Sequence, residues 1–410
     1  MFKEEFMRII MLSWEYPPRI VGGISRVVYD LAQNLGAEGN EIHVVTCCEH
    51  GAKAVEKDEN VFVHRVATYD INPTNFTDWV LQLNFAFIEY SSRLIGEFGR
   101  FDIIHAHDWI VAFAARVLKY GYNIPMVCTI HATEYGRNWG IYNDTQKYIS
   151  SIEWMLTYEA WKVIVNSGYM KTEVRNIFSL PEDKIRIVHN GVDIDKFKGL
   201  HKDFGFRRNY ASDNEKIVFF VGRLVHEKGV HVLMDAIPKI LSYYNDVKFV
   251  IAGKGPQLDY LRMKTAEMGI SQKVYFTGYI SDEDLARLYK CCDIAVVPSL
   301  YEPFGIVALE GIVAGVPVVV SDTGGLGEIV EHGRDGMKFY TGNSNSLADC
   351  ILELLFNPDK VSEIVKNAYE KAARLYDRRI ISMRTLEVYR EILDENEKVK
   401  WTMPKIRDML

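Results

Sequence analysis

Two glutamates, Glu302 and Glu310, flank a Pro-Phe-Gly turn and are the residues best suited to carry chemistry in this chain. The apolar run before them, 294–297, is typical of a buried parallel strand, and the residues after Gly305 are typical of a helix. Glu302 is therefore expected in a strand-to-helix turn, at the sheet edge where open α/β folds bind ligands. Glu310 is expected about two turns along the helix. Free backbone N–H groups at the start of that helix could meet a phosphate or sugar hydroxyls. The spacing alone would also suit an ordinary loop with exposed acids.

A second group of charged residues follows a predicted strand that ends at Val221. The next loop, 222–229, carries Arg223 and Lys228 between two glycines that let the backbone turn tightly. Arginine can grip a diphosphate with two hydrogen bonds and lysine adds a point charge, so the pair could stabilise a departing nucleoside diphosphate without a metal. A surface loop with two solvated charges explains the same residues, and the loop alone does not decide between these interpretations.

The first half of the chain places polar residues at three further strand ends. Gly22 and Gly23 precede a predicted helix, where the backbone could approach a phosphate or a sugar. Asp108 lies in the segment 105–109, whose polar and aromatic groups suit a carbohydrate site. His131 follows the next strand and could hydrogen-bond a sugar hydroxyl, or backbone, near the reacting centre.

Other segments allow a binding or a purely structural interpretation. The loop 253–256 lacks the third glycine of a dinucleotide fingerprint and is expected to pack beside a nucleotide base. The glycine-rich loop 324–328 is either a plain turn or a ligand contact. The segment 193–195 has the D-x-D form of metal-dependent sugar transferases, but Asn190-Gly191 beside it favours a turn or a helix cap. His105 is better interpreted as a packed core histidine than as a ligand.

These residues need a scaffold of parallel strands, and each half of the chain supplies one. Short β-branched runs alternate with longer amphipathic runs, which is the signature of parallel α/β sheets. The strands are predicted at 7–12, 42–46, 102–105, 126–130 and 163–166, and at 217–221, 248–252, 274–277, 294–297 and 316–321. Helices are predicted at 24–35 and 380–393, and the last residues are expected to be weakly structured. The segment 189–193 and the polar stretch 198–216 are predicted to form a hinge.

The composition bounds the class of protein. At 410 residues the chain is too long for one ordinary core, so two domains are expected. The net charge of −7 disfavours a nucleic-acid partner. The six cysteines show no zinc-ligand or disulfide-framework spacing, and reduced thiols suit a cytoplasmic protein. The sequence shows no signal peptide, spanning segment or basic amphipathic helix, so no firm membrane association is expected.

Assembled, these motifs resemble those of the retaining glycosyltransferases of the GT-B fold, and among them bacterial glycogen and starch synthases. The resemblance covers most of the chain and is carried by Gly22-Gly23, His107-Asp108-Trp109, His131, Asn190-Gly191-Val192-Asp193, Gly222-Arg223 with Lys228, and Glu302-Pro303-Phe304-Gly305 through Glu310. It implies an α/β protein with two facing doubly wound Rossmann-like domains and a cleft between them. The acceptor-side domain would span 1–195, the nucleotide-sugar domain 196–375, and a C-terminal helix at 376–410 would return to the first domain.

The resemblance also implies the work of each site residue. Arg223 and Lys228 would bind the diphosphate, and Glu310 would bind the ribose. The donor sugar would be held by Glu302 and by the backbone of Phe304, Gly305 and Ile306, and His131 would line its reactive face. Further binding residues would be Gly22, Gly23 and Asp108. The family implies retention of anomeric configuration with neither a metal nor a cofactor. The diphosphate would leave and the acceptor attack on the same face, with the phosphate taking the acceptor's proton.

The expected reaction is transfer of glucose from ADP-glucose or UDP-glucose to an α-1,4-glucan. One position departs from the synthase pattern, because Ile20 stands where those enzymes carry a lysine, with Arg19 adjacent. This leaves a small sugar, a sugar phosphate or a glycolipid open as the acceptor. A two-domain sugar-binding protein without catalysis is a third interpretation, in which Arg223 and Lys228 would have no purpose. The sequence does not fix the nucleotide base, the acceptor or the oligomeric state.

Overall fold

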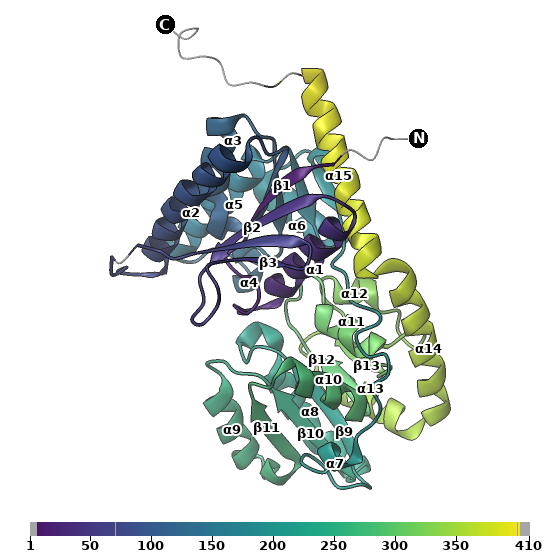
Figure 1. Cartoon of the computed structure of the whole chain (residues 1–410). Helices are drawn as coiled ribbons and strands as arrows, with labels where there is room; N and C mark the ends of the chain where they lie inside the picture. The colour runs from purple at the N-terminus through teal and green to yellow at the C-terminus, as the bar shows by residue number, and fades with distance from the viewer. Residues whose placement is uncertain (1–5, 70, 400, 402–410) are drawn as a thin grey trace, which may run out of the picture. The chain divides into compact units, whose positions relative to one another are not determined.

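The computed structural model describes residues 6–69, 71–399 and 401. The chain divides into two compact units, each built around a largely parallel sheet (Figure 1). Unit 1 contains the residues up to Gly191 and from Arg378 onward, and unit 2 contains Val192–Asp377. The boundaries thus lie at 191/192 and 377/378 rather than at 195/196 and 375/376. The polar stretch 198–216 belongs to unit 2, where part of it is helical, so it is not the hinge.

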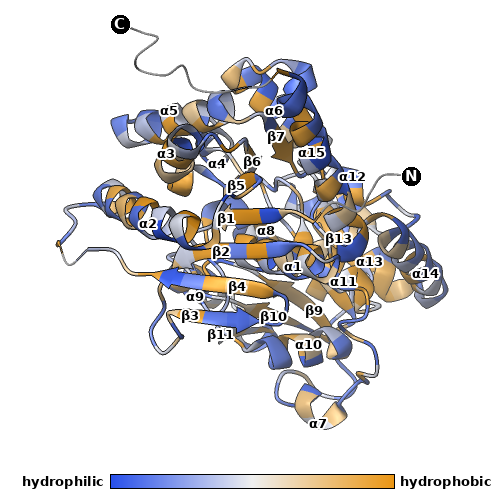
Figure 2. Cartoon of the chain, turned by 45° about the horizontal axis from the view of Figure 1, so that its top comes forward, coloured by the Kyte–Doolittle hydropathy of each residue, from blue (hydrophilic) through white to orange (hydrophobic). Residues whose placement is uncertain are grey.

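The sheet of unit 1 has eight strands in the order β3-β4-β2-β1-β5-β6-β7-β8, and all neighbours are parallel except β3 and β4. In this order the strands are Val55–Asp58, Val61–Val66, Glu41–Cys47, Arg8–Leu12, Ile103–His107, Met126–Ile130, Lys162–Val165 and Ile185–Ile187. The central strands are buried on both faces, as parallel strands covered by helices must be. The edge strand β3 is mostly polar, whereas the neighbouring β4 is mostly apolar (Figure 2). Polar side chains on an edge strand make pairing with another chain less favourable.

Helices cover both faces of this sheet. One core contains residues of α2, α3, α5 and α6, and the other contains residues of α1 and α15. The helices of unit 1 are α1 (Gly23–Ala37), α2 (Phe76–Phe98), α3 (Ala112–Tyr122), α4 (Glu134–Asn138), α5 (Asp144–Glu159), α6 (Gly168–Phe178) and α15 (Arg378–Val399). The helix predicted at 380–393 is therefore longer than expected, and it packs beside α1 in unit 1 (Figure 1).

Unit 2 repeats the same architecture with six parallel strands in the order β11-β10-β9-β12-β13-β14. In this order they are Val274–Gly278, Val247–Ala252, Lys216–Val221, Ile294–Val297, Val318–Ser321 and Met337–Phe339. Residues of α10, α11 and α14 lie in one core and residues of α8 and α13 in the other. The helices are α7 (Phe204–Arg207), α8 (Val230–Tyr243), α9 (Leu258–Glu267), α10 (Asp282–Cys291), α11 (Ile306–Val313), α12 (Leu326–Ile329), α13 (Ser344–Phe356) and α14 (Pro358–Leu375).

Each predicted strand is present; 126–130 and 294–297 have the predicted ends, and the ends of the others shift by one or two residues. The strand predicted from Val316 begins at Val318, because Pro317 has no backbone N–H to give to a ladder. The strands that the sequence pattern missed are β3, β4, β8 and β14, which are short or lie near the edges of the sheets. The predicted weak structure of the last residues falls largely on 402–410, outside the described residues.

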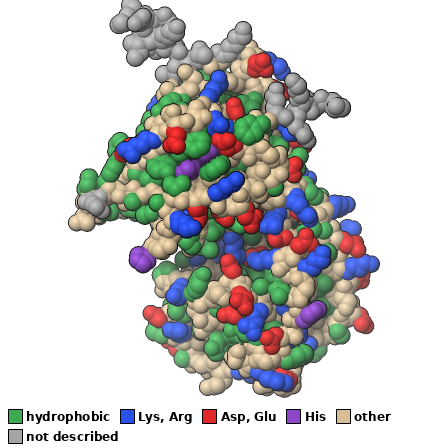
Figure 3. Space-filling model, viewed as in Figure 1, with side chains coloured by type: hydrophobic (Ala, Val, Ile, Leu, Met, Phe, Trp, Pro, Cys, Tyr) green, Lys and Arg blue, Asp and Glu red, His purple; other side chains and the backbone are tan. Residues whose placement is uncertain are grey.

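Two properties of the described surface bear on partners. Positive and negative side chains are interspersed over the part of the face shown in Figure 3 that the structure describes, in keeping with a net charge of only −7. Among the described helices, none combines the length and the apolar character that crossing a bilayer requires.

Candidate functional site

The strand order of unit 2 reverses between β9 and β12, which is the place where open α/β sheets bind ligands. The loops that follow β9, β10 and β12 meet there, backbone against backbone. A Cβ atom on Gly229 would lie 1.9 Å from the carbonyl oxygen of Pro298, and one on Gly253 would lie 1.9 Å from that of Gly222. Glycine is required at both crossings, and the loops support one another as a rigid group.

Lys228 and Glu302 meet at this strand edge. Nζ of Lys228 donates to Oε2 of Glu302 at 2.7 Å, and Oγ of the fully buried Ser299 donates to the same oxygen at 2.9 Å. The side chains of Lys228 and Glu302 are only 23% and 14% exposed, so solvent screens their contact less than that of a surface pair. The expectation that Glu302 lies in the turn between a strand and a helix is confirmed.

The loop 324–328 packs against the backbone of Glu302. Gly325 N–H donates to the carbonyl oxygen of Glu302 at 3.0 Å. Gly324 has φ +51°, and a Cβ atom there would lie 2.0 Å from the same carbonyl oxygen. Within unit 2 the loop therefore packs closely against the turn that carries Glu302.

In the Pro-Phe-Gly turn the aromatic ring is buried, so the backbone is the part that could contact a ligand. Phe304 is buried, and its ring packs edge-on against Tyr376 with 5.9 Å between the centroids. Gly305 has φ +120° and stands before Ile306, the first residue of α11. Gly305, the N-cap residue, has no side chain with which to cap this helix, and its carbonyl oxygen accepts the N–H groups of Ala308 and Leu309 at 3.0 and 3.3 Å.

Arg223 and Glu310 occupy different environments in unit 2. Half of the Arg223 side chain is exposed, and its Nη2 lies 3.4 Å from Glu227, a contact too long and exposed to hold the guanidinium in place. Glu310 is buried, and Nζ of Lys196 donates to its carboxylate at 2.6 Å. Because α11 begins at Ile306, Glu310 lies only a little more than one turn along it rather than two.

In unit 1 the strand order reverses between β1 and β5, and Asp108 and His131 lie at the corresponding edge. Oδ1 of Asp108 accepts the backbone N–H of His131 at 2.8 Å. Asp108 is buried with φ +60°, a conformation that is costly for a residue other than glycine and that clusters at functional sites. The structure therefore brings these two predicted residues together.

Three buried histidines lie side by side in unit 1. The rings of His105 and His107 are 4.0 Å apart between centroids, and those of His107 and His131 are 5.4 Å apart. Burial lowers the pKa of His105 to about 3, and it lowers the pKa of His107 and of His131 as well. All three imidazoles are therefore neutral at pH 7. His105 bonds to Tyr389 and Thr129, at 2.6 and 2.7 Å, which confirms it as a packed core histidine.

Gly22 and Gly23 begin α1 as predicted, but the structure places a carboxylate beside them. The backbone N–H groups of Val21 and Gly22 donate to Oε2 of the buried Glu15 at 2.9 and 2.8 Å. Any anion that approached these N–H groups would have to displace Glu15.

Arg19, the cation next to the position of the missing lysine, is already engaged in unit 1. Its Nη1 donates to Glu49 at 2.9 Å, and its guanidinium lies over the rings of Trp14 and Trp79. These contacts direct the side chain into an aromatic cluster.

The sequence interpretation missed Ser299, Lys196 and Glu15. Ser299 and Glu15 follow strand ends closely enough to have been suspected. Lys196 lies 114 positions from Glu310 in the sequence, and no local sequence pattern predicts their contact.

Among the described residues, no group of three or more His, Cys, Asp or Glu is placed to hold a metal ion. Asp193 accepts the N–H of Asp195 on its side chain at 3.0 Å, and its carbonyl accepts the N–H of Lys196. These hydrogen bonds form a turn, as the sequence predicts for this segment.

Comparison with known proteins decides the family. Residues 21–196 match Glycosyltransferase Family 4, and residues 202–371 match Glycosyl transferases group 1. An uncharacterized glycosyltransferase of Methanocaldococcus jannaschii is 39% identical over 390 residues, which cover 94% of this chain and 98% of that protein. The chain belongs to the glycosyltransferases. The glycogen synthase of Mycobacterium tuberculosis is 33% identical to this glycosyltransferase, over 93% of the chain and 94% of the relative.

Solved structures show that the glycosyltransferase has the GT-B fold. Sucrose-phosphate synthase from Thermosynechococcus elongatus matches with a TM-score of 0.82 at 23% identity, covering 95% of this chain and all of that one. The HepE protein of Anabaena, solved in complex with UDP-glucose, matches with a TM-score of 0.76 at 22% identity, over 94% of this chain and all of that one.

Proposed function

We propose that this glycosyltransferase moves glucose from ADP-glucose or UDP-glucose to the end of an α-1,4-glucan and retains the anomeric configuration. The observation that carries the proposal is the 2.7 Å contact between Lys228 and Glu302. It puts a cation suited to a diphosphate and a carboxylate suited to sugar hydroxyls at one strand edge. The 33% identity to a glycogen synthase along nearly the whole chain supports the choice of acceptor.

Unit 2 would bind the donor. Lys228, already fixed by Glu302, would hold the diphosphate, and the half-exposed Arg223 would turn to it. The carboxylate of Glu302 and the backbone at Phe304, Gly305 and Ile306 would hold the glucose. Glu310 would accept from the ribose hydroxyls in addition to Lys196.

Unit 1 would bind the acceptor and line the reactive face of the glucose. His131 would face the sugar as a neutral imidazole, because burial lowers its pKa. Asp108 would fix the backbone of His131. Gly22 and Gly23 would let the chain approach the substrate closely, while Glu15 holds the loop in shape.

The bond changes balance without a metal or another bound cofactor. The bond between glucose C1 and the diphosphate oxygen breaks while the acceptor hydroxyl oxygen bonds to C1 on the same face. The proton of that hydroxyl passes to the departing diphosphate. Arg223 and Lys228 would meet the negative charge as it develops, which is the role a divalent cation plays elsewhere.

The reaction would take place in the cytoplasm. Five of the six cysteines are buried, all six are unpaired thiols, and burial raises the pKa of Cys128 and Cys292. Protonated, buried thiols suit a reducing compartment.

A small sugar or sugar phosphate is the second candidate for the acceptor. The observation that favours it is Arg19, whose contacts with Glu49 and Trp14 would have to be given up before it could replace the absent lysine. The structural match to a sucrose-phosphate synthase is consistent with this alternative.

The test is analysis of the product. The purified protein is incubated with each donor and maltooligosaccharides, and the product is resolved by chain length and by the proton NMR signals of the new linkage. A longer oligosaccharide with a new α-1,4 bond supports the proposal. A β linkage would refute retention, and transfer to a sugar phosphate alone would establish the second candidate.

A further inference from the structure

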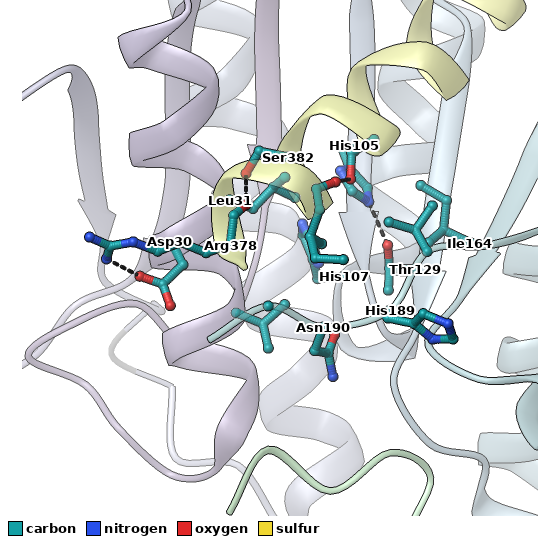
Figure 4. A pocket seen from close by; sticks show the side chains of 15 residues that line it. Asp30, Leu31, His105, His107, Thr129, Ile164, His189, Asn190, Arg378 and Ser382 are labelled. Atoms are coloured by element: carbon teal, nitrogen blue, oxygen red, sulfur yellow. Dashed lines mark hydrogen bonds and ion pairs between the residues drawn. The ribbon is translucent and has the colours of Figure 1, made fainter. Parts of the chain in front are cut away.

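A small cavity lies in unit 1 at the carboxyl ends of β5 and β6 (Figure 4). It measures about 30 Å³ and is bounded by α1, the first turns of α15 and the segment 188–191. A water molecule needs about 10–15 Å³ of such space, so one or two can be held. His105 and His107 both contribute to its wall.

His107 has one ring nitrogen satisfied and one not. Its Nδ1 lies 3.2 Å from Nε2 of His131, within hydrogen-bonding distance. Its Nε2 is buried and finds no hydrogen-bonding partner in the described part of the chain. A buried polar atom left in this state costs free energy comparable to a lost hydrogen bond, and the cavity beside His107 has room for a water molecule that would bond to it.

We infer that His107 is a positioning residue for His131, and that a water molecule in the cavity completes it. Nδ1 of His107 determines which nitrogen of His131 carries the proton, and Nε2 of His107 holds the water. The inference deepens the proposed function and rests on it for the role of His131 at the reacting sugar.

The hydrogen bond constrains both rings at once. Because the two imidazoles are neutral, one proton lies between Nδ1 of His107 and Nε2 of His131. If His131 supplies it, both rings carry their proton on Nε2. If His107 supplies it, both rings carry it on Nδ1. The two residues must therefore have the same tautomer.

The shared tautomer fixes what His131 can offer a substrate. With Nε2 bound to His107, Nδ1 is the nitrogen left to face a ligand, and it is a fixed acceptor in one case and a fixed donor in the other. Without His107 the ring would rotate and exchange tautomers, and only a fraction of molecules would have the nitrogen that the sugar requires.

Nitrogen NMR tests the tautomer directly, without any substrate. The full chain is labelled with ¹⁵N-histidine, and the His107 and His131 signals are assigned with single His→Gln variants. We expect both rings at pH 7 in one and the same tautomer, and we expect His131 in His107→Phe to show averaged shifts. Opposite tautomers in the wild type, or a His131 signal unchanged in His107→Phe, would overturn the inference.

Two matched substitutions distinguish the roles of the two ring nitrogens of His107. The amide of His107→Asn can take the place of Nδ1, whereas that of His107→Gln can take the place of Nε2. We expect turnover in His107→Asn within about threefold of wild type, and in His107→Gln lower by about tenfold or more at a nearly unchanged KM. Equal activity in the two variants, with equal thermal unfolding, would overturn the inference. Absence of transfer by the wild-type protein would refute the proposed function alone, since the NMR result does not depend on it.

Discussion

Nζ of Lys228 lies 2.7 Å from Oε2 of Glu302, although the two residues are 74 positions apart. Each stands at the end of a different parallel strand, and the reversal of strand order between β9 and β12 brings the two strand ends together. The pair is largely buried and is supported by Ser299, so it is held in place before any substrate arrives.

Breaking this pair is expected to reduce activity while the protein stays folded. Lys228→Ala and Glu302→Ala should each lower kcat at least about tenfold, because each removes charge at the diphosphate or the sugar. Lys239→Ala is the control, since it breaks the exposed ion pair with Asp349 in the same unit. Steady-state release of nucleoside diphosphate gives the rates, and circular dichroism checks the fold. A folded Lys228→Ala protein with full turnover would refute the role of the lysine.

Removal of divalent ions is expected to leave activity largely intact. In the proposed mechanism Arg223 and Lys228 supply the positive charge, and the side chain of Asp193 accepts the N–H of Asp195 in a turn. The rate is measured after dialysis against EDTA and again after magnesium or manganese is restored. Strict dependence on the ion, lost in Asp193→Asn, would show that the D-x-D segment binds a metal.

Gly324→Ala is expected to destabilise unit 2 and to abolish turnover. A Cβ atom there would lie 2.0 Å from the carbonyl oxygen of Glu302, at φ +51°. We expect a loss of about 3 kcal/mol in the free energy of unfolding. Gly315→Ala is the matched control, because φ is +80° but no atom lies within 4 Å, and it should cost only about 1–2 kcal/mol. Urea titration measures both, and equal losses would contradict the contact.

Glu153 is expected to make stability depend on pH. Glu153 lies in α5, is 1% exposed, and accepts the backbone N–H of Glu134, which is three residues after His131. Burial raises the pKa of the Glu153 carboxyl to about 8. The folded state therefore holds a proton that the unfolded chain has released. Between pH 4.5 and 8 this group lowers the free energy of unfolding as pH rises, by up to about 1.4 kcal/mol per unit.

Glu153→Gln tests this linkage, because glutamine keeps the acceptor oxygen and cannot ionise. Urea unfolding at several pH values should show a flatter profile and a more stable protein at pH 8 than the wild type. The exposed-site variant Glu97→Gln should retain the wild-type slope. A Glu153→Gln variant less stable than wild type at pH 8 would mean that the buried carboxyl is ionised and bound.

The sequence predicted the scaffold well because parallel strands buried on both faces leave continuous apolar runs. The placement of Glu302 followed from one such run, 294–297, and from the glycine that starts α11. The strands β8 and β14 have three residues each, too few for a periodic signal.

Contacts between residues far apart in the sequence could not be predicted from local sequence patterns. The contacts of Glu310 with Lys196 and of Gly22 with Glu15 depend on how loops cross after the sheet has formed. Glu310 lies only a little more than one turn along α11 rather than the two turns expected, although α11 begins after Gly305 as predicted. The roles of Arg223, His131 and the other site residues remain predictions.

The measurement that tests the central claim most directly is the release of nucleoside diphosphate from ADP-glucose and UDP-glucose, separately, with and without maltooligosaccharides. We expect release from one donor that requires the oligosaccharide, and we expect it to fall at least about tenfold in Lys228→Ala. Release at the same rate with and without the oligosaccharide would contradict glucan synthesis, as would the absence of release from either donor. Either result would direct the search to other acceptors and sugars.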